Sequence, residues 1–275
     1  MLAGGLHHYG TERVRSRMRL ELADTTNYCA AFYEAIEPGA TTSAEVIVPL
    51  TMQLLEPRSV LDVGCGRGVW LKAFQRAGVR ILKGIDGPHV ERDDLLIGPE
   101  QFVAMDLRNP APVDGHFDLA VCLEVAEHLP PSAGTGLVKL LTQAAPVVLF
   151  AAAIPGQGGT GHINERWPEY WRRLFAEDGY QLTDPIRPYV WSNQRVEWWY
   201  RQNMVMFCSP AVLEIRQHLK RHLCSDTDPV LEWVHRGMIR SDAMGSPSGR
   251  ELCRMLLRRV WRRVAPRNEM FTAGE

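Results

Sequence analysis

Short apolar segments alternate with amphipathic segments through the middle of the chain. The apolar segments are SVLDVG, ILKGID, FVAM, FDLAVCL and VVLFAAA, at residues 59–64, 81–86, 102–105, 117–123 and 147–153. Helical periodicity appears between several of them, as in VWLKAFQRAG (69–78) and AGTGLVKLLTQAA (133–145). Continuous apolar strands that alternate with helices are typical of a parallel sheet covered on both faces. The pattern predicts a doubly wound α/β fold that binds its ligands at the carboxyl ends of the strands.

Helical periodicity also appears on the N-terminal side of this region. Residues 12–36 show it, and we expect Pro38 and Gly39 to stop that helix. A second helix is predicted over SAEVIVPLTMQLL (43–55), which leads to Pro57. The expected organisation is a helical cap over residues 1–50, a ligand-binding domain over 51–209 and a helical extension over 210–275.

The C-terminal extension contains a basic amphipathic segment, SGRELCRMLLRRVWRRVAPR (248–267). Its apolar residues Leu252, Leu256, Val260 and Trp261 are set against arginines at 250, 254, 258, 259, 262 and 263. Such helices usually pack their apolar stripe on their own domain, and we favour that interpretation. An anionic surface, a protein partner or a homodimer contact is the alternative.

The composition is that of an ordinary soluble globular protein. The 275 residues are 45% hydrophobic and 23% charged, with a net charge of −1. Phosphate binding needs a basic excess, so a nucleic-acid partner is disfavoured. No apolar run approaches the roughly 18 residues of a membrane span, and residues 1–17 lack the apolar core of a signal peptide. The 6 cysteines form no CxxC pair, so we expect reduced thiols in a cytoplasmic protein.

A glycine-rich turn follows the first predicted strand. In LDVGCGRGVW (61–70), Asp62, Gly64, Gly66 and Gly68 form a D-x-G-x-G-x-G pattern between a strand and a helix. Glycines let the backbone approach a ligand, and the following helix N-terminus offers free N–H groups. The third glycine of a dinucleotide fingerprint is replaced by Val69, and the Gly-Lys-Ser/Thr of a phosphate loop is absent. A merely tight turn is the alternative interpretation.

Acidic residues also end the next two predicted strands. Asp86, which ends ILKGID, can accept hydrogen bonds from both hydroxyls of a ribose. Met105, Asp106 and Leu107 follow the third strand and suit an adenine, with apolar faces and one polar edge. Each aspartate taken alone is also a common turn or cap residue. Three acids at three successive strand ends favour a nucleoside ligand.

These motifs together carry a resemblance to a known family. VLDVGCGRG, GID, AMDL and FDLAVCLEVAEHL resemble the successive motifs of class I S-adenosylmethionine-dependent methyltransferases, over residues 28–208. The resemblance implies a Rossmann-like, seven-stranded, mostly parallel sheet whose last strand is antiparallel, with NMVMFCS (203–209) as the candidate strand. It implies these cofactor contacts: for the methionine part, Asp62, Gly64, Cys65 and Gly66; for the ribose, Asp86 and Gly87; for the adenine, Met105, Asp106 and Leu107; beside the sulfonium, Leu123 and Glu124.

Two further segments, IPGQGGTGHINERWPEYW (154–171) and WWYRQN (198–203), resemble a bacterial subgroup of small-molecule, natural-product type enzymes. A sulfonium methyl group is already activated, so the protein must mainly align the acceptor and exclude water. A neutral acceptor also loses a proton, and His128 and His162 are the candidate bases. Glu127 completes the set of candidate catalytic residues. Structural or surface histidines are the alternative.

Aromatic residues gather between residues 167 and 200. Phe175 is the best candidate for the core, and Tyr180 for the start of a strand. The remaining aromatics suit an acceptor lid over about residues 160–200, for which we select Asn164, Trp167, Trp191 and Trp198. Asn164, Glu165 and Arg201 either orient polar groups of the acceptor or pair with one another.

The segment CLEVAEHLPP (122–131) allows a metal site. If a helical turn begins near the strand end, Glu124, Glu127 and His128 share one face. The E-x-x-E-H pattern with the distant His162 resembles the metal site of small-RNA terminal ribose methyltransferases, and its first part resembles ubiquinone-pathway O-methyltransferases. That ligand set suits Mg²⁺ or Mn²⁺, and less well Zn²⁺ or Fe²⁺. Many metal-free methyltransferases carry the same run, and we favour the metal-free interpretation.

The leading hypothesis is O-methylation of a small metabolite or natural product, sugar-bearing or aromatic, with S-adenosylmethionine as the cofactor. N-methylation of a small molecule is one alternative, and a non-catalytic scaffold with the same fold is another. The intact set of Asp62, Asp86 and Asp106 argues against a decayed site. The expected partner is a small-molecule acceptor, with a homodimer left open.

Overall fold

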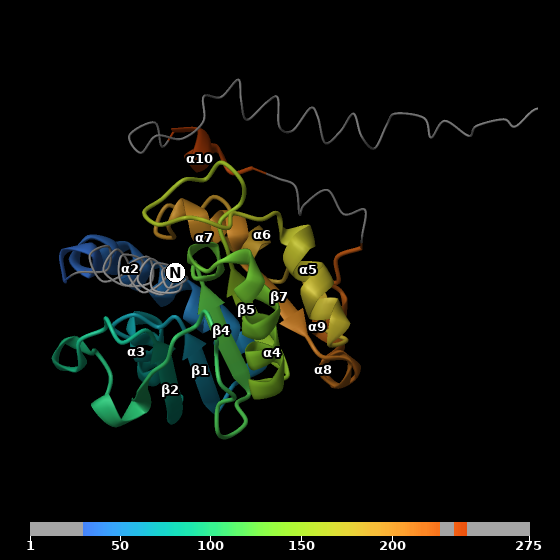
Figure 1. Ribbon diagram of the computed structural model, residues 1–275. Coiled ribbons are helices and arrows are strands. Elements are labelled where there is room, and N and C mark those ends of the chain that lie inside the picture. The colour runs from blue at the N-terminus through green and yellow to red at the C-terminus, as the bar shows by residue number, and fades with distance from the viewer. Residues whose placement is uncertain (1–29, 226–233, 241–275) are drawn as a thin grey trace, which may run out of the picture.

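A seven-stranded sheet runs through the centre of the computed structural model, which describes residues 30–225 and 234–240 (Figure 1). The strand order is β3-β2-β1-β4-β5-β7-β6. The chain reverses direction across the sheet between β1 and β4, which is where doubly wound folds bind ligands. The strands are β1 (Ser59–Val63), β2 (Ile81–Asp86), β3 (Phe102–Ala104), β4 (Leu119–Leu123), β5 (Val147–Ala151), β6 (Gln181–Thr183) and β7 (Val205–Cys208).

Strands β1 to β5 are parallel, whereas β7 pairs antiparallel with both β5 and β6. Every residue of β1, β4 and β5 is buried, which explains why their sequences are continuously apolar. The predicted sheet is therefore confirmed, and so is NMVMFCS as its antiparallel strand.

Helices cover both faces of the sheet (Figure 1). On one face α2 (Ala30–Leu55) and α3 (Val69–Arg76) share a core with Val60 and Val121. On the other, α4 (Gly134–Ala144) and α5 (Pro168–Glu177) pack with Leu61 and Phe150. Phe175 is fully buried and stacks on Phe207, so its predicted core position is confirmed. The shorter helices are α6 (Arg187–Val190), α7 (Trp198–Asn203), α8 (Pro210–Ile215), α9 (Gln217–Lys220), α10 (Arg236–Arg240), and the 3₁₀ turns Arg92–Asp94, Pro99–Gln101, Ala126–His128 and Pro131–Ala133.

The expected helix end at Pro38 and Gly39 is wrong, because α2 continues through both of them. Pro38 and Pro49 both lie inside α2, and each removes one backbone hydrogen bond. The hydroxyl of Ser43 donates to the Gly39 carbonyl at 2.7 Å, and Ile47 is fully buried against the sheet. Tertiary packing therefore outweighs the local helix-breaking tendency.

The predicted domain limits keep their status as predictions. Helix α2 crosses residue 50, where we expected the cap to meet the ligand-binding domain. The start of the N-terminal periodicity, residues 12–29, and the basic segment 248–267 lie outside the described residues. Among the described helices, none is both long and apolar enough to cross a membrane.

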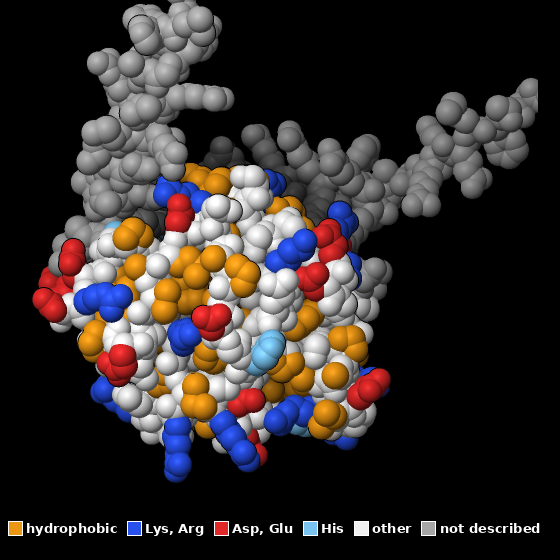
Figure 2. Space-filling view, turned by 60° about the horizontal axis from the view of Figure 1, so that its bottom comes forward, with side chains coloured by type: hydrophobic (Ala, Val, Ile, Leu, Met, Phe, Trp, Pro, Cys, Tyr) orange, Lys and Arg blue, Asp and Glu red, His pale blue; other side chains and the backbone are white. Residues whose placement is uncertain are grey.

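Charged side chains of both signs are interspersed with apolar ones over the face shown in Figure 2. The described part of that face shows no continuous basic area.

Candidate active site

The glycine-rich turn between β1 and α3 is built around positive backbone angles. The φ angles of Gly64, Gly66 and Gly68 are 79°, 52° and 89°. A Cβ atom on Gly64 would lie 2.2 Å from Val125 Cγ2, so no other residue fits this position. The amides of Gly64 and Cys65 donate to the Ile85 carbonyl, which fixes the turn against the end of β2.

Asp86 holds this turn from the end of β2. One carboxylate oxygen accepts from the Gly66 amide and the other from the Gly87 amide, each at 2.6 Å. Burial raises the pKa of Asp86, while these amides and the nearby His89 oppose that rise. Each oxygen keeps a second lone pair, so the carboxylate can still accept hydrogen bonds from a ribose.

Asp62 lies beneath the same turn and is 2% exposed. Its Oδ2 atom has no hydrogen-bond partner within residues 30–225 and 234–240. Burial, and secondarily Asp86, raise the pKa of Asp62 well above its ordinary value. A buried acceptor without a partner fits a ligand that brings a donor, such as the ammonium group of an amino acid.

The three residues predicted to border an adenine differ in their exposure to solvent. Leu107 is buried and Met105 half-buried, and both contact the core beside Val125. Asp106 is exposed, and Arg108 donates to its two carboxylate oxygens at 2.8 and 2.9 Å. This pairing orients the Asp106 side chain, and no sequence pattern indicated it.

Glu124 follows β4 directly and has a left-handed conformation, with φ at 55°. Its carboxylate accepts from Gln157 Nε2 and from Asn203 Nδ2, each at 2.9 Å. Asn203 Nδ2 also donates to Gln157 Oε1, which closes a three-residue network. Burial raises the pKa of Glu124, and the two amide donors oppose the rise. Leu123, just before it, is buried.

Glu124 is not part of the helical turn that contains Glu127 and His128. The turn is a 3₁₀ helix that begins at Ala126, so the expected single helical face from Glu124 to His128 is wrong. Glu127 is fully buried, and neither carboxylate oxygen accepts a hydrogen bond of normal geometry within the described residues. Burial, followed by Glu124, raises the pKa of Glu127 well above its ordinary value.

His128 and His162 lie together, with ring centroids 4.8 Å apart. One ligand atom from each of Glu127, His128 and His162 lies within 4.8 Å of the other two. Glu124 is not a member of this group. Burial and the neighbouring His162 lower the pKa of His128 to about 4, so its imidazole is neutral at physiological pH.

His162 pairs with Glu165 inside the loop between β5 and α5. Glu165 Oε1 lies 3.0 Å from His162 Nδ1. The amides of Gly156 and Gly158 each donate to the same carboxylate at 2.7 Å. Burial alone would raise the pKa of Glu165, but the hydrogen bonds from His162 and the two amides lower it below its ordinary value. The carboxylate is therefore ionised and rigidly held.

The predicted lid residues occupy the same end of the sheet. Asn164 is buried, and its Nδ2 donates to the Ala126 carbonyl, so it anchors the loop and does not face solvent. Trp167 and Trp198 pack with Ile154 and with Met238 of α10. Trp191 contacts the ring of His235 at 4.9 Å. Sequence reasoning did not include the 234–240 segment in the lid.

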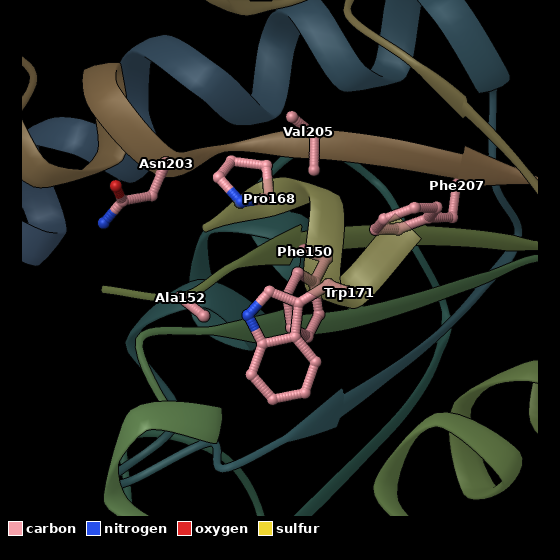
Figure 3. A pocket seen from close by; sticks show the side chains of 7 residues that line it. All are labelled: Phe150, Ala152, Pro168, Trp171, Asn203, Val205 and Phe207. Atoms are coloured by element: carbon pink, nitrogen blue, oxygen red, sulfur yellow. The ribbon is translucent and has the colours of Figure 1, made fainter. Parts of the chain in front are cut away.

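A small cavity of about 10 Å³ lies between α5 and the neighbouring strands β5 and β7 (Figure 3). It has room for about one water molecule and not for an acceptor. Its lining residues are Phe150, Ala152, Pro168, Trp171, Asn203, Val205 and Phe207.

The fold is a doubly wound domain, and the glycine-rich turn and Asp86 lie at its switch point. Residues 15–221 match the family model described as "Methyltransferase domain". The chain therefore belongs to this methyltransferase family, and the expected class I S-adenosylmethionine-dependent type is confirmed at family level.

Curated relatives share part of the sequence. A ubiquinone biosynthesis O-methyltransferase of Methylococcus capsulatus is 31% identical over 110 residues, which cover 34% of this chain and 45% of the relative. The enzyme of the same name from Xanthomonas oryzae pv. oryzae is 27% identical over 146 residues, or 47% of this chain and 56% of the relative. The chain thus spans about half the length of these relatives.

Two solved structures are similar to this chain. A plantazolicin methyltransferase, BpumL, in complex with a pentazolic desmethylPZN analog and SAH has a TM-score of 0.49 and 16% identity, and the match covers 68% of this chain and 91% of that one. A SAM-dependent methyltransferase from Archaeoglobus fulgidus has a TM-score of 0.46 and 18% identity, with 55% and 74% covered.

Proposed function

We propose that this chain transfers the methyl group of S-adenosylmethionine to a hydroxyl oxygen of a small molecule, with His162 as the proton acceptor. The pairing of His162 with Glu165 carries this proposal. An ionised carboxylate can only accept a hydrogen bond, so Nδ1 of His162 carries the ring proton. The lone pair of Nε2 is then left to take the proton of an acceptor hydroxyl, as in other base–orienter pairs.

The cofactor contacts follow the glycine-rich turn. Asp62 supplies a buried acceptor for the ammonium group, and the backbone of Gly64, Cys65 and Gly66 borders the methionine part. Asp86 with Gly87 takes the ribose hydroxyls, and Met105, Asp106 and Leu107 border the adenine. When bound, S-adenosylmethionine supplies an activated methyl group.

The transfer site lies at the end of β4. Leu123 and the Glu124–Gln157–Asn203 network border the position of the sulfonium. Holding the acceptor in line with the methyl group can lower the barrier by roughly 7–11 kcal/mol in favourable cases. A positioned base adds about 10²–10⁴-fold. The names of the curated relatives support oxygen over nitrogen as the methylated atom.

Metal binding is the second candidate role for the same histidines. The close grouping of Glu127, His128 and His162, together with the unpartnered buried oxygens of Glu127, would fit Mg²⁺ or Mn²⁺. Because Glu124 is not a member, the group has two imidazoles and one carboxylate, which also suits Zn²⁺ and Fe²⁺. Such an ion would hold an acceptor hydroxyl and increase its acidity. Glu165 would then orient His162 as a ligand, as carboxylates commonly do.

Rates of methyl transfer to a dihydroxybenzene test the proposal. We expect His162→Ala to reduce kcat by about 10²-fold or more while S-adenosylhomocysteine binds normally. His116→Ala, which removes an exposed imidazole, is the matched control and should act as wild type. Cofactor binding without transfer to oxygen or nitrogen acceptors would favour a non-catalytic scaffold.

A further inference from the structure

Arg201 carries a buried positive charge that forms no close ion pair with a carboxylate among the described residues; Glu197 acts on it only from a longer distance. The residue lies in α7 and is 6% exposed. Its Nη1 atom donates to the Trp191 carbonyl at a long 3.4 Å, and its buried Nε has no hydrogen-bond partner within the described ranges. Arg187, in contrast, forms an ion pair with Asp184 at 2.8 Å. Burying a charge without a counter-ion is strongly unfavourable, so the position of Arg201 calls for an anion.

Arg236 and the imidazole of His235 lie near Arg201. Burial, together with the charges of Arg201 and Arg236, lowers the pKa of His235 and favours its neutral form. His235 Nε2 lies 3.0 Å from the same Trp191 carbonyl oxygen. Burial lowers the pKa of Arg201, the charge of Glu197 opposes this effect, and the nearby Arg236 adds to it. Two neighbouring guanidinium groups attract an anionic ligand.

Helix α7 connects Arg201 to the proposed transfer site. Asn203, two residues later, donates to Glu124 at the end of β4. Trp198, three residues earlier, lies against Gly237, where a Cβ atom would be 2.6 Å from the Trp198 Cβ. Figure 1 shows α10 over α7 at this end of the molecule. The helix that carries Arg201 therefore reaches the proposed transfer site through Asn203 and the 234–240 segment through Trp198, while the Arg201 guanidinium itself lies at the Trp191 carbonyl.

We propose that Arg201 binds a carboxylate of the methyl acceptor, so that the substrate class is hydroxylated aromatic acids. This inference rests on the proposed function and adds the chemical class of its acceptor. The planar guanidinium suits a carboxylate, which it can bind through two parallel hydrogen bonds. The indole rings of Trp191 and Trp198 supply the aromatic surroundings.

A pair of probes that differ in one charge tests this inference. The full chain, saturated with S-adenosylhomocysteine, is titrated in a calorimeter with homoprotocatechuate, a dihydroxyphenylacetate, and with hydroxytyrosol, the corresponding alcohol. We expect the acid to bind about tenfold tighter or more. Arg201→Gln should abolish this preference by weakening binding of the acid far more than binding of the alcohol, whereas Arg201→Lys should retain part of it.

Arg195→Gln is the matched control. Arg195 lies in the loop before α7, and its exposed guanidinium pairs with Glu45 of α2. The control variant should keep the preference for the acid. Arg201→Gln should unfold at the same Tm as wild type or higher, since it removes an unpaired buried charge. If that variant does not fold, the wild-type probe pair and Arg201→Lys decide.

Equal affinities for the two probes in wild type, or binding of neither, would overturn the inference. Failure of the proposed function gives a different result: the acid still binds more tightly, but no methyl group reaches either probe. Methyl transfer to both probes with equal affinity would retain the function and reject the role of Arg201.

Discussion

Glu165 fixes the orientation of His162, because its Oε1 atom lies 3.0 Å from His162 Nδ1 and two backbone amides hold the carboxylate in place. His162 in turn lies over Gly159, where a Cβ atom would be 2.4 Å from the imidazole Nε2. The imidazole thus has one permitted tautomer and little freedom to move. This is the arrangement that a general base requires.

Glu165→Gln is expected to lower kcat by about tenfold or more, because the amide no longer stabilises the imidazolium formed when His162 takes a proton. The Kd of S-adenosylhomocysteine should not change. Glu169→Gln is the control, since Glu169 pairs with Arg172 and Arg173 on α5. Loss of kcat and of thermal stability together would instead assign Glu165 to the loop structure.

Asp86→Ala should weaken cofactor binding by at least about tenfold, because hydrogen bonds to a charged acceptor contribute about 1.5–3 kcal/mol each. The variant also releases the amides of Gly66 and Gly87, so both the ribose contact and the shape of the turn are lost. Calorimetry with S-adenosylhomocysteine measures the change, and Asp93→Asn, at an exposed position, is the control. Unchanged affinity would reduce Asp86 to an ordinary turn residue.

Trp198→Ala should raise the KM for the acceptor by about tenfold and leave the cofactor Kd nearly unchanged. The reason is that the indole packs with Ile154 and Met238, away from the glycine-rich turn. Tyr189→Ala, which removes a side chain from a residue that is 68% exposed, should change neither constant. A fall in Tm with normal kinetics would place Trp198 in the structural core.

The fold was largely predictable from the sequence because its signals are local. The apolar runs around Leu61, Val121 and Leu149 identify buried strands, and the glycine pattern at Gly64 identifies the turn. The end of α2 was predicted wrongly, since burial of Ile47 outweighs two prolines and depends on a sheet that is distant in sequence.

The site was only partly predictable, for the same reason. Asn203 reaches Glu124 across 79 residues, and no local pattern indicates such a contact. Met238 packs with Trp198 from outside the predicted lid segment. Glu165 was predicted to orient the acceptor or to pair with Asn164 or Arg201, because nothing in GHINE shows that its carboxylate turns toward His162. Polar networks between strand ends depend on tertiary geometry, which a single sequence does not reveal.

Exhaustive chelation distinguishes a base from a metal ligand. We expect full methyl transfer by the chelated enzyme, because His162 oriented by Glu165 needs no ion to accept a proton. Loss of transfer with intact cofactor binding, followed by recovery on adding Mg²⁺ or Mn²⁺, would assign Glu127, His128 and His162 to a metal centre. A chelator preloaded with Ca²⁺ controls for direct effects of the chelator.

Calorimetric titration of the full chain with S-adenosylmethionine tests the central claim most directly, since it requires no knowledge of the acceptor. The account predicts saturable binding at one site per chain, of both S-adenosylmethionine and S-adenosylhomocysteine, that weakens in Asp62→Asn and in Asp86→Ala. Binding of neither compound by the folded wild-type protein would contradict the assignment of this site to methyl transfer.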